Sequence, residues 1–205
     1  YQSMKDWVNF MSNNSENNLF IKKDHWGDWL FFSRDNDNSG RSAVTSKKLI
    51  AQAFYCYSTK LLINTAKVLE IKEDIEEYSA LYEKIRYAFN AEFVSNNGML
   101  MSDTQTAYVL ALQFNLLSNE HTEIAVNRLV DNIKNYGHLT TGFLGTPFLC
   151  HVLSDNGKHA EAVELLLRTK YPSWLYPVTK GATTIWAVSY THLRAHETRE
   201  DRGGR

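Results

Sequence analysis

The feature that most constrains this chain is an alternation between two kinds of predicted helix. The 205 residues contain only three prolines and no sustained period-two pattern, so we expect a mostly helical chain. Three segments are apolar on nearly all sides: 46–69, 104–117 and 147–154. Each precedes a segment with a single apolar stripe: 73–93, 119–135 and 158–169. An all-apolar helix must be buried, whereas a striped one lies at a surface. The order therefore predicts three helical hairpins in an α/α toroid, with inner helices enclosed by outer ones.

The links between these segments alternate in length. Links from an inner to an outer helix are short, and they contain Ser118, which suits an N-cap, and Gly157, which suits a tight reversal. The links that lead into an inner helix are long, at 22–45, 94–103, 136–146 and 170–183. In an up-down arrangement all the long loops emerge at one rim. Because functional residues concentrate in long loops on a rigid scaffold, we predict that this rim is the functional face.

Four of the five tryptophans lie in or beside these long loops, at Trp26, Trp29, Trp174 and Trp186. Taken singly, each tryptophan is better explained by packing. Together with short polar side chains on one rim, they are typical of a sugar site, because a sugar presents apolar C–H faces and a belt of hydroxyls. We therefore predict that five substrate-binding residues converge on one concavity: Asp28, Trp29, Thr141, Trp174 and Trp186. Within this set, Asp28 is predicted to accept sugar hydroxyls. Thr146-Pro147 is predicted to be an N-cap followed by a first-turn proline.

Composition argues against several other kinds of function. The net charge is −1, which favours neither nucleic acid nor an anionic membrane as a partner, and no apolar run approaches the length of a membrane span. The histidines lack metal-ligand spacing. Residues 35–40, "DNDNSG", resemble the start of a calcium loop but lack its closing glutamate, so a solvated loop is the better interpretation. We predict no metal and no nucleic-acid or membrane partner. The compartment stays unassigned, with the cytoplasm favoured.

Six motifs occur in order along the chain: "GDW" (27–29), "LIAQAFYCYSTKLL" (49–62), "YEKIRYAFNAEFV" (82–94), "TQTAYVLAL" (104–112), "GHLTTGFLGTPFLCHVLSDNG" (137–157) and "YPSWLYPVTKGATTIW" (171–186). Together they resemble the bacterial α-L-rhamnosidases of glycoside hydrolase family 78. The resemblance covers residues 1–186. It implies an all-α fold, a partial (α/α)6 barrel, from an enzyme that hydrolyses terminal α-L-rhamnose from glycosides with inversion. It implies a rhamnose-containing glycoside as the partner and no organic cofactor.

The resemblance also indicates where catalytic carboxylates are expected. Inversion requires one carboxylic acid and one carboxylate base on opposite sides of the scissile bond. In the family the acid lies in an Asp/Glu-rich motif upstream of the first block quoted above, and this chain has no such motif. The base is expected directly after "GATTIW", where this chain has Ala187. We therefore predict that the chain retains neither catalytic carboxylate and is inactive by itself.

The family pattern stops after Trp186, which divides the chain into two predicted parts. Residues 1–186 are predicted to be part of the catalytic domain, and 187–205 to be a non-native, adapter-like disordered tail, with a divergent natural C-terminus as the alternative. An incomplete barrel is expected to leave inner helices such as 106–117 partly uncovered. Two other functions remain open, namely an (α/α)6 glycosidase for a different sugar and a non-catalytic α-hairpin scaffold that binds a protein.

Overall fold

The computed structural model describes residues 1–21, 25–32 and 44–184, and in these ranges the chain is helical, with only two isolated β-bridges and no strand. None of the helices in the described ranges combines the length and the apolarity that a membrane crossing requires. The eight helices are α1 (Gln2–Asn13), α2 (Lys47–Val68), α3 (Lys72–Phe93), α4 (Gln105–Gln113), α5 (Asn119–Tyr136), α6 (Thr146–Asp155), α7 (His159–Leu167) and α8 (Tyr176–Thr179).

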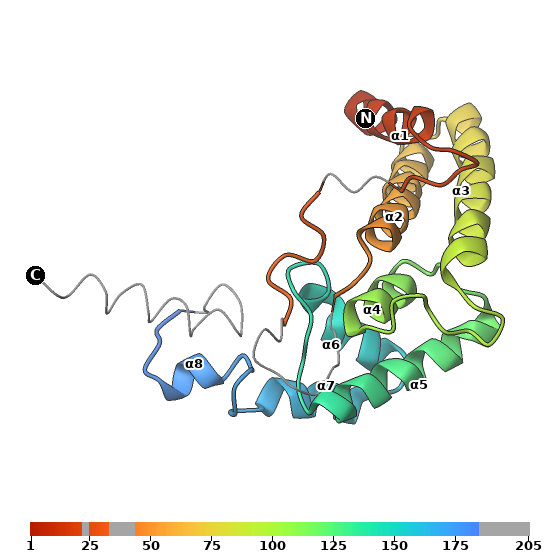
Figure 1. Ribbon diagram of the computed structural model, residues 1–205. Coiled ribbons are helices and arrows are strands. Elements are labelled where there is room, and N and C mark those ends of the chain that lie inside the picture. Colours follow the sequence, from red (N-terminus) through yellow and green to blue (C-terminus); the bar gives the residue numbers. More distant parts are fainter. Residues whose placement is uncertain (22–24, 33–43, 185–205) are drawn as a thin grey trace, which may run out of the picture.

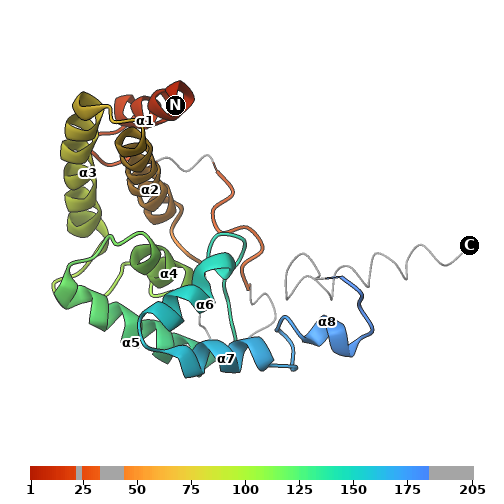
Figure 2. The same ribbon diagram turned by 180° about the vertical axis from the view of Figure 1, so that it is seen from behind.

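Six of these helices form three consecutive hairpins. Helix α2 packs on α3, α4 on α5 and α6 on α7, while α4 also contacts both α2 and α6. Figure 1 shows the hairpins following one another along an arc, with α3, α5 and α7 on its outer side, and Figure 2 shows the same order from behind. The predicted alternation of inner and outer helices is confirmed, and so is the all-α class. The short helix α8 falls within a segment that we predicted to be a loop.

The inner helices are not equally buried, which corrects one expectation. Eight of the nine residues of α4 are buried, from Gln105 to Leu112, so the segment that we expected to be partly uncovered lies at the centre of the core. The open surface belongs to α6 instead, where only Leu149, Val152 and Leu153 of ten residues are buried. The physical reason is position, because α4 has an inner helix on each side, whereas the main contacts of α6 among the described helices are with α4 and α7.

Local signals place most of the helix ends as predicted. Ser118 caps α5, because its side chain accepts a hydrogen bond from the backbone N–H of His121, and Gly157 adopts a left-handed conformation with φ of 74° after α6. The prediction for α6 is wrong by one residue. Its N-cap is Gly145, and the Thr146 hydroxyl bonds back to Thr141 instead of capping the helix. The long links do enter the inner helices and the short ones do leave them.

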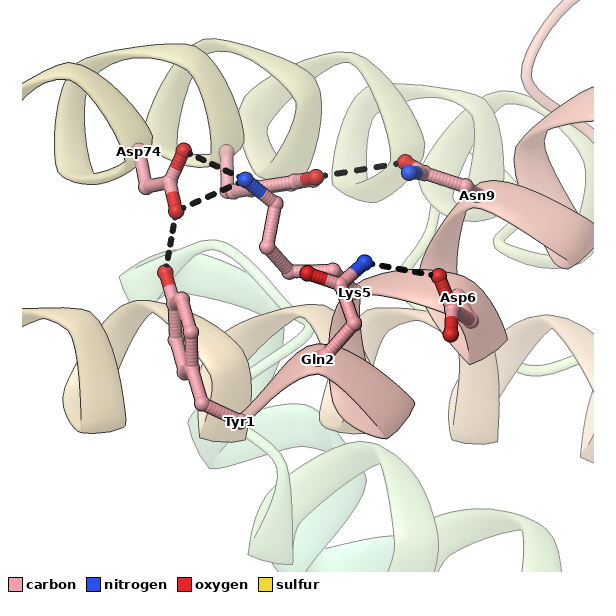
Figure 3. A network of polar contacts seen from close by, with 7 residues as sticks. Tyr1, Gln2, Lys5, Asp6, Asn9 and Asp74 are labelled. Atoms are coloured by element: carbon pink, nitrogen blue, oxygen red, sulfur yellow. Dashed lines mark hydrogen bonds and ion pairs between the residues drawn. The ribbon is translucent and has the colours of Figure 1, made fainter.

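Helix α1 is held against the first hairpin by a polar network (Figure 3). The Lys5 Nζ atom lies 2.9 Å from both carboxylate oxygens of Asp74 on α3, and the Tyr1 hydroxyl donates to Asp74 Oδ2 at 2.5 Å. The Tyr78 hydroxyl donates to Asn9 Oδ1 at 3.2 Å. The hydrogen bonds from Lys5 and then Tyr1 lower the pKa of Asp74, and the hydrogen bond to Asp74 raises the pKa of Lys5. The network therefore favours the charged forms of both groups.

The burial of α4 generates a first prediction. Leu110 is 0% exposed, so Leu110→Ala removes a fully packed side chain and should lower the free energy of unfolding by about 2–5 kcal/mol. Leu167→Ala on α7 is the matched control, because Leu167 is 67% exposed and its loss should change stability by less than about 0.5 kcal/mol. Urea unfolding followed by circular dichroism measures both variants. Equal effects of the two substitutions would contradict the inner position of α4.

The α1–α3 network generates a second prediction, on acid stability. Because the pKa of Asp74 is lowered, the folded state favours the charged carboxylate. The contribution of this carboxylate to stability is present above the ordinary carboxyl pKa and is lost as the pH falls through the lowered pKa. The free energy of unfolding should therefore decrease less between pH 7 and pH 3 in Asp74→Asn than in the unsubstituted chain. Glu76→Gln removes an exposed carboxylate from the same helix and should retain the unsubstituted pH dependence. Identical pH profiles for Asp74→Asn and Glu76→Gln would refute this role of Asp74.

Candidate functional site

The long loops meet at the N-terminal ends of the inner helices. The segment 25–32 runs beside the loop 137–145, which enters α6, and both views show the two segments next to each other (Figures 1 and 2). The backbone N–H of Phe143 donates to the Trp29 carbonyl at 3.0 Å, and the N–H of Phe32 donates to the Thr140 carbonyl at 2.9 Å. We call these two segments, 25–32 and 137–145, the loop pair. The predicted meeting of the long links is thereby confirmed for those that enter α2 and α6, and the use of this rim stays a prediction.

Asp28 joins the loop pair to the inner helix α4. Its carboxylate is buried and accepts three hydrogen bonds from the protein. The Thr106 hydroxyl, in the first turn of α4, and the Gly142 N–H donate to Oδ2, the latter at 2.8 Å, while the Leu144 N–H donates to Oδ1 at 2.8 Å. The partial positive charge of a helix N-terminus also favours a carboxylate at this position. Asp28 thereby holds three separate segments of the chain together.

Two glycines allow this close approach. A Cβ atom on Gly142 would lie 2.4 Å from the Trp29 carbonyl oxygen and 2.7 Å from that of Asp28, which are backbone atoms that cannot move aside. A Cβ atom on Gly145 would lie 2.7 Å from the Thr106 hydroxyl and 2.8 Å from Thr141 Cγ2. Close packing therefore requires Gly142 and Gly145 of "GHLTTGFLGTP", whereas Gly137 serves as the left-handed C-cap of α5.

The first residues of α4 complete the attachment of the rim. The buried Gln105 side chain donates to the His138 carbonyl at 3.0 Å and accepts from the Thr140 N–H at 2.8 Å. The Thr104 hydroxyl caps α4 and lies 2.7 Å from the Thr45 hydroxyl, which ties the entry of α2 to the same place. The polar sequence Thr104-Gln105-Thr106 thus anchors rim segments, and the apolar residues after it form the core.

The third rim loop, 94–104, is attached through Asp103. The hydroxyl of Tyr108 on α4 donates to Asp103 Oδ1 at 2.7 Å, and the Asn132 side chain donates to the Asp103 carbonyl at 3.0 Å. Burial, followed by the hydrogen bond to Asp103, raises the pKa of Tyr108, so this tyrosine remains a neutral donor at physiological pH.

Two tryptophans stand on the loop pair beside Asp28. The rings of Trp26 and Trp29 meet edge to face with centroids 5.0 Å apart, and the side chains are 78% and 48% exposed. Exposed indole faces next to a rigidly held backbone can stack on the apolar face of a sugar. Of the described rim residues, this pair offers the aromatic surface that the sequence analysis expected.

The structure brings together three of the five predicted site residues. Asp28, Trp29 and Thr141 belong to the loop pair, but the Thr141 hydroxyl is buried and pairs with the Thr146 hydroxyl at 2.8 Å. Trp174 is half-buried against the hydrophobic core, and within the described ranges no hydrogen bond or ring stacking joins it to the other three. Trp186 and Ala187 lie outside the described residues, as do the predicted tail and the 35–40 loop. Direct sugar contacts by these residues remain predictions.

Several residues that shape the site were missed by the sequence analysis. They are Gln105, Thr106, Gly142 and Gly145, with Trp26 placed on the rim but not among the five. Thr104-Gln105-Thr106 carried a usable signal, because three polar residues precede an otherwise apolar helix.

Two surface hollows, of about 540 and 670 Å³, lie at α3 beside residues 17–19 and between the ends of α5 and α7. Neither is lined by any of the five predicted residues.

A row of helical hairpins with its long loops joined at one rim is part of an (α/α)6 toroid, and known proteins share it. The family model of the bacterial alpha-L-rhamnosidase six-hairpin glycosidase domain matches residues 1–200. An alpha-L-rhamnosidase of Formosa agariphila is 41% identical over 188 residues, which cover 91% of this chain and 20% of that protein. The crystal structure of the Streptomyces avermitilis alpha-L-rhamnosidase complexed with L-rhamnose matches with a TM-score of 0.84 at 37% identity, over 93% of this chain and 17% of that one. The native Aspergillus terreus enzyme matches with a TM-score of 0.82 at 31% identity, over 93% and 22%.

The chain therefore belongs to the bacterial alpha-L-rhamnosidase six-hairpin glycosidase family. This confirms the resemblance drawn from the motifs. The chain spans 17% to 20% of the length of three curated relatives that it matches. The family match runs past residue 186, where we predict that the domain ends, and that boundary stays a prediction because residues 185–205 lie outside the described part.

The contacts of Asp28 generate a third prediction. Asn at position 28 presents one carbonyl oxygen and an NH2 group, so at least one of the three donors loses its partner. Asp28→Asn should therefore lower the free energy of unfolding by about 1–3 kcal/mol. Asp131→Asn on the exposed face of α5 is the control and should be nearly neutral. Urea unfolding at pH 7 compares the two, and a neutral result for Asp28→Asn would rule out a structural role for the carboxylate.

Proposed function

We propose that this chain is the sugar-binding part of an inverting α-L-rhamnosidase that hydrolyses terminal non-reducing α-L-rhamnose from glycosides. The observation that carries the proposal is the match, over 93% of this chain, to a relative whose structure is complexed with L-rhamnose. The family assignment supports a glycoside as substrate, and the exposed pair Trp26 and Trp29 supports a sugar-stacking surface on the rim.

In this proposal the loop pair supplies a rigid binding surface. The buried Asp28 carboxylate fixes the two loops that carry the exposed tryptophans. The tryptophans therefore do not have to be ordered when a sugar binds, and the entropic cost of binding is reduced. Among the described residues, Asp28 Oδ1 accepts one hydrogen bond, and a carboxylate oxygen can accept two. One acceptor position therefore remains for a sugar hydroxyl, in agreement with the predicted role of Asp28.

The catalytic step requires groups that we do not assign to this chain. Inversion needs an acid that protonates the leaving oxygen and a base that activates water from the opposite face. Ala187 has no titratable group and occupies the position where the resemblance implies the base. We propose that the chain binds rhamnose without hydrolysing it, and that restoring Glu at position 187 alone does not rescue turnover.

A fourth prediction tests binding. L-Rhamnose titrated into the 15N-labelled chain should shift the indole N–H resonances of Trp26 and Trp29, because both rings lie at the proposed surface. Trp29→Ala should weaken binding by about 2- to 10-fold, the range for losing one aromatic contact. Trp7→Ala is the matched control, since Trp7 is 52% exposed but lies on α1, and it should bind rhamnose normally.

The same titration separates the alternatives. Tighter binding of another deoxyhexose or hexose would favour a glycosidase for a different sugar, and no saturable binding of any sugar would favour a protein-binding scaffold. An aryl α-L-rhamnoside assay tests the absence of catalysis. Turnover by the 205-residue chain at about 1–10³ per second would overturn the assignment of position 187.

A further inference from the structure

His25 lies directly before the tryptophan pair and makes two hydrogen bonds with its ring. The Gly27 backbone N–H lies 3.1 Å from His25 Nδ1, and His25 Nε2 lies 3.0 Å from the carbonyl oxygen of Lys47, the first residue of α2. The ring therefore connects the turn that carries Trp26, Gly27 and Asp28 to an inner helix.

The two partners determine the protonation state of the ring. A backbone N–H can only donate, so Nδ1 must be unprotonated in order to accept from Gly27. A carbonyl can only accept, so Nε2 must carry the proton that is shared with Lys47. Both bonds exist together only in the neutral imidazole with its hydrogen on Nε2. A proton added at Nδ1 removes the acceptor and places two donors face to face.

The bond to Gly27 holds a turn that has little freedom. Gly27 adopts a left-handed conformation with φ of 69°, and a Cβ atom there would lie 3.3 Å from Lys47 Cγ. Trp26 precedes this glycine, and Asp28 and Trp29 follow it. The direction of both exposed indoles therefore depends on the geometry at Gly27.

We infer that His25 is a positioning residue for sugar binding, whose neutral ring fixes the turn at Gly27 and whose protonation releases it and weakens binding in acid. The inference rests on the proposed sugar-binding function.

The experiment must distinguish the effect of His25 from the effects of other charged or titratable groups on the segments around this turn. On the same turn Asp28 carries a carboxylate, on α2 Lys47 packs its side chain against Gly27, and on the loop 137–145 His138 contacts the ring of Phe32 at 4.7 Å between centroids. His25→Asn keeps all three of these residues. Asn also supplies a side-chain oxygen that can accept from the N–H two residues on, and this oxygen does not titrate in the range studied.

The experiment follows the 15N-labelled 205-residue chain between about pH 8 and pH 5. We expect the Gly27 amide and the Trp29 indole N–H resonances to move with the same midpoint as the His25 ring resonance. In His25→Asn they should stay in place. His159→Asn on α7 is the matched control and should retain the unsubstituted response.

L-Rhamnose affinity provides the second measurement. Acidification should weaken binding to the unsubstituted chain by about 2- to 10-fold, the range for losing one hydrogen bond, and should leave His25→Asn unchanged. The inference would be overturned if the Gly27 and Trp29 resonances shifted with a midpoint pH different from that of His25, or if they shifted equally in His25→Asn. Absence of rhamnose binding at every pH would refute the proposed function and with it the effect on binding, while the resonances would still decide whether His25 holds the turn. If His25→Asn does not fold, the comparison of midpoints in the unsubstituted chain decides the matter.

Discussion

The rim of this protein depends on one buried carboxylate. Asp28 accepts hydrogen bonds from the Thr106 hydroxyl and from the backbone N–H groups of Gly142 and Leu144, which come from three segments far apart in the sequence. A buried charge is tolerated only when it is hydrogen-bonded, and the buried N–H groups are equally in need of an acceptor. Both requirements are met only when the loops close on the end of α4. The site surface is therefore a consequence of satisfying polar groups below it.

The same need to pair buried polar groups explains why polar residues occur in the most buried helix. Gln105 and Thr106 are buried at the start of α4, where the Gln105 side chain binds rim backbone and the Thr106 hydroxyl donates to the Asp28 carboxylate. The remaining buried residues of α4 are almost all apolar and pack against its neighbours. One helix thus forms the core with most of its length and holds the loop pair with its first turn. Changes in core packing should for this reason be transmitted to the rim.

Burial and exposure on the rim divide its residues into two groups. Asp28 and Thr141 are buried and make hydrogen bonds within the protein, whereas Trp26 and Trp29 remain largely exposed on the surface that those bonds create. Carbohydrate recognition needs both kinds, because a weak stacking contact gains strength when the ring is already in place. His25 extends this division, since its two hydrogen bonds are made to backbone and serve the orientation of its neighbours.

The sequence by itself determined the six hairpin helices, their order of inner and outer, and the long links that enter the inner ones. Periodicity carries this information because an all-apolar helix such as 104–117 cannot face water, and Ser118 and Gly157 act through their own local backbone. The quoted sequence motifs also identified the family to which the chain belongs. Only the tertiary structure decided that Asp28 is buried, that Gly142 faces the backbone of residues 28–31 and Gly145 the side chain of Thr106, and that α6, not α4, has the open side. These properties depend on pairs of atoms from segments up to 116 residues apart, such as Asp28 and Leu144. No local pattern in the sequence records such distances.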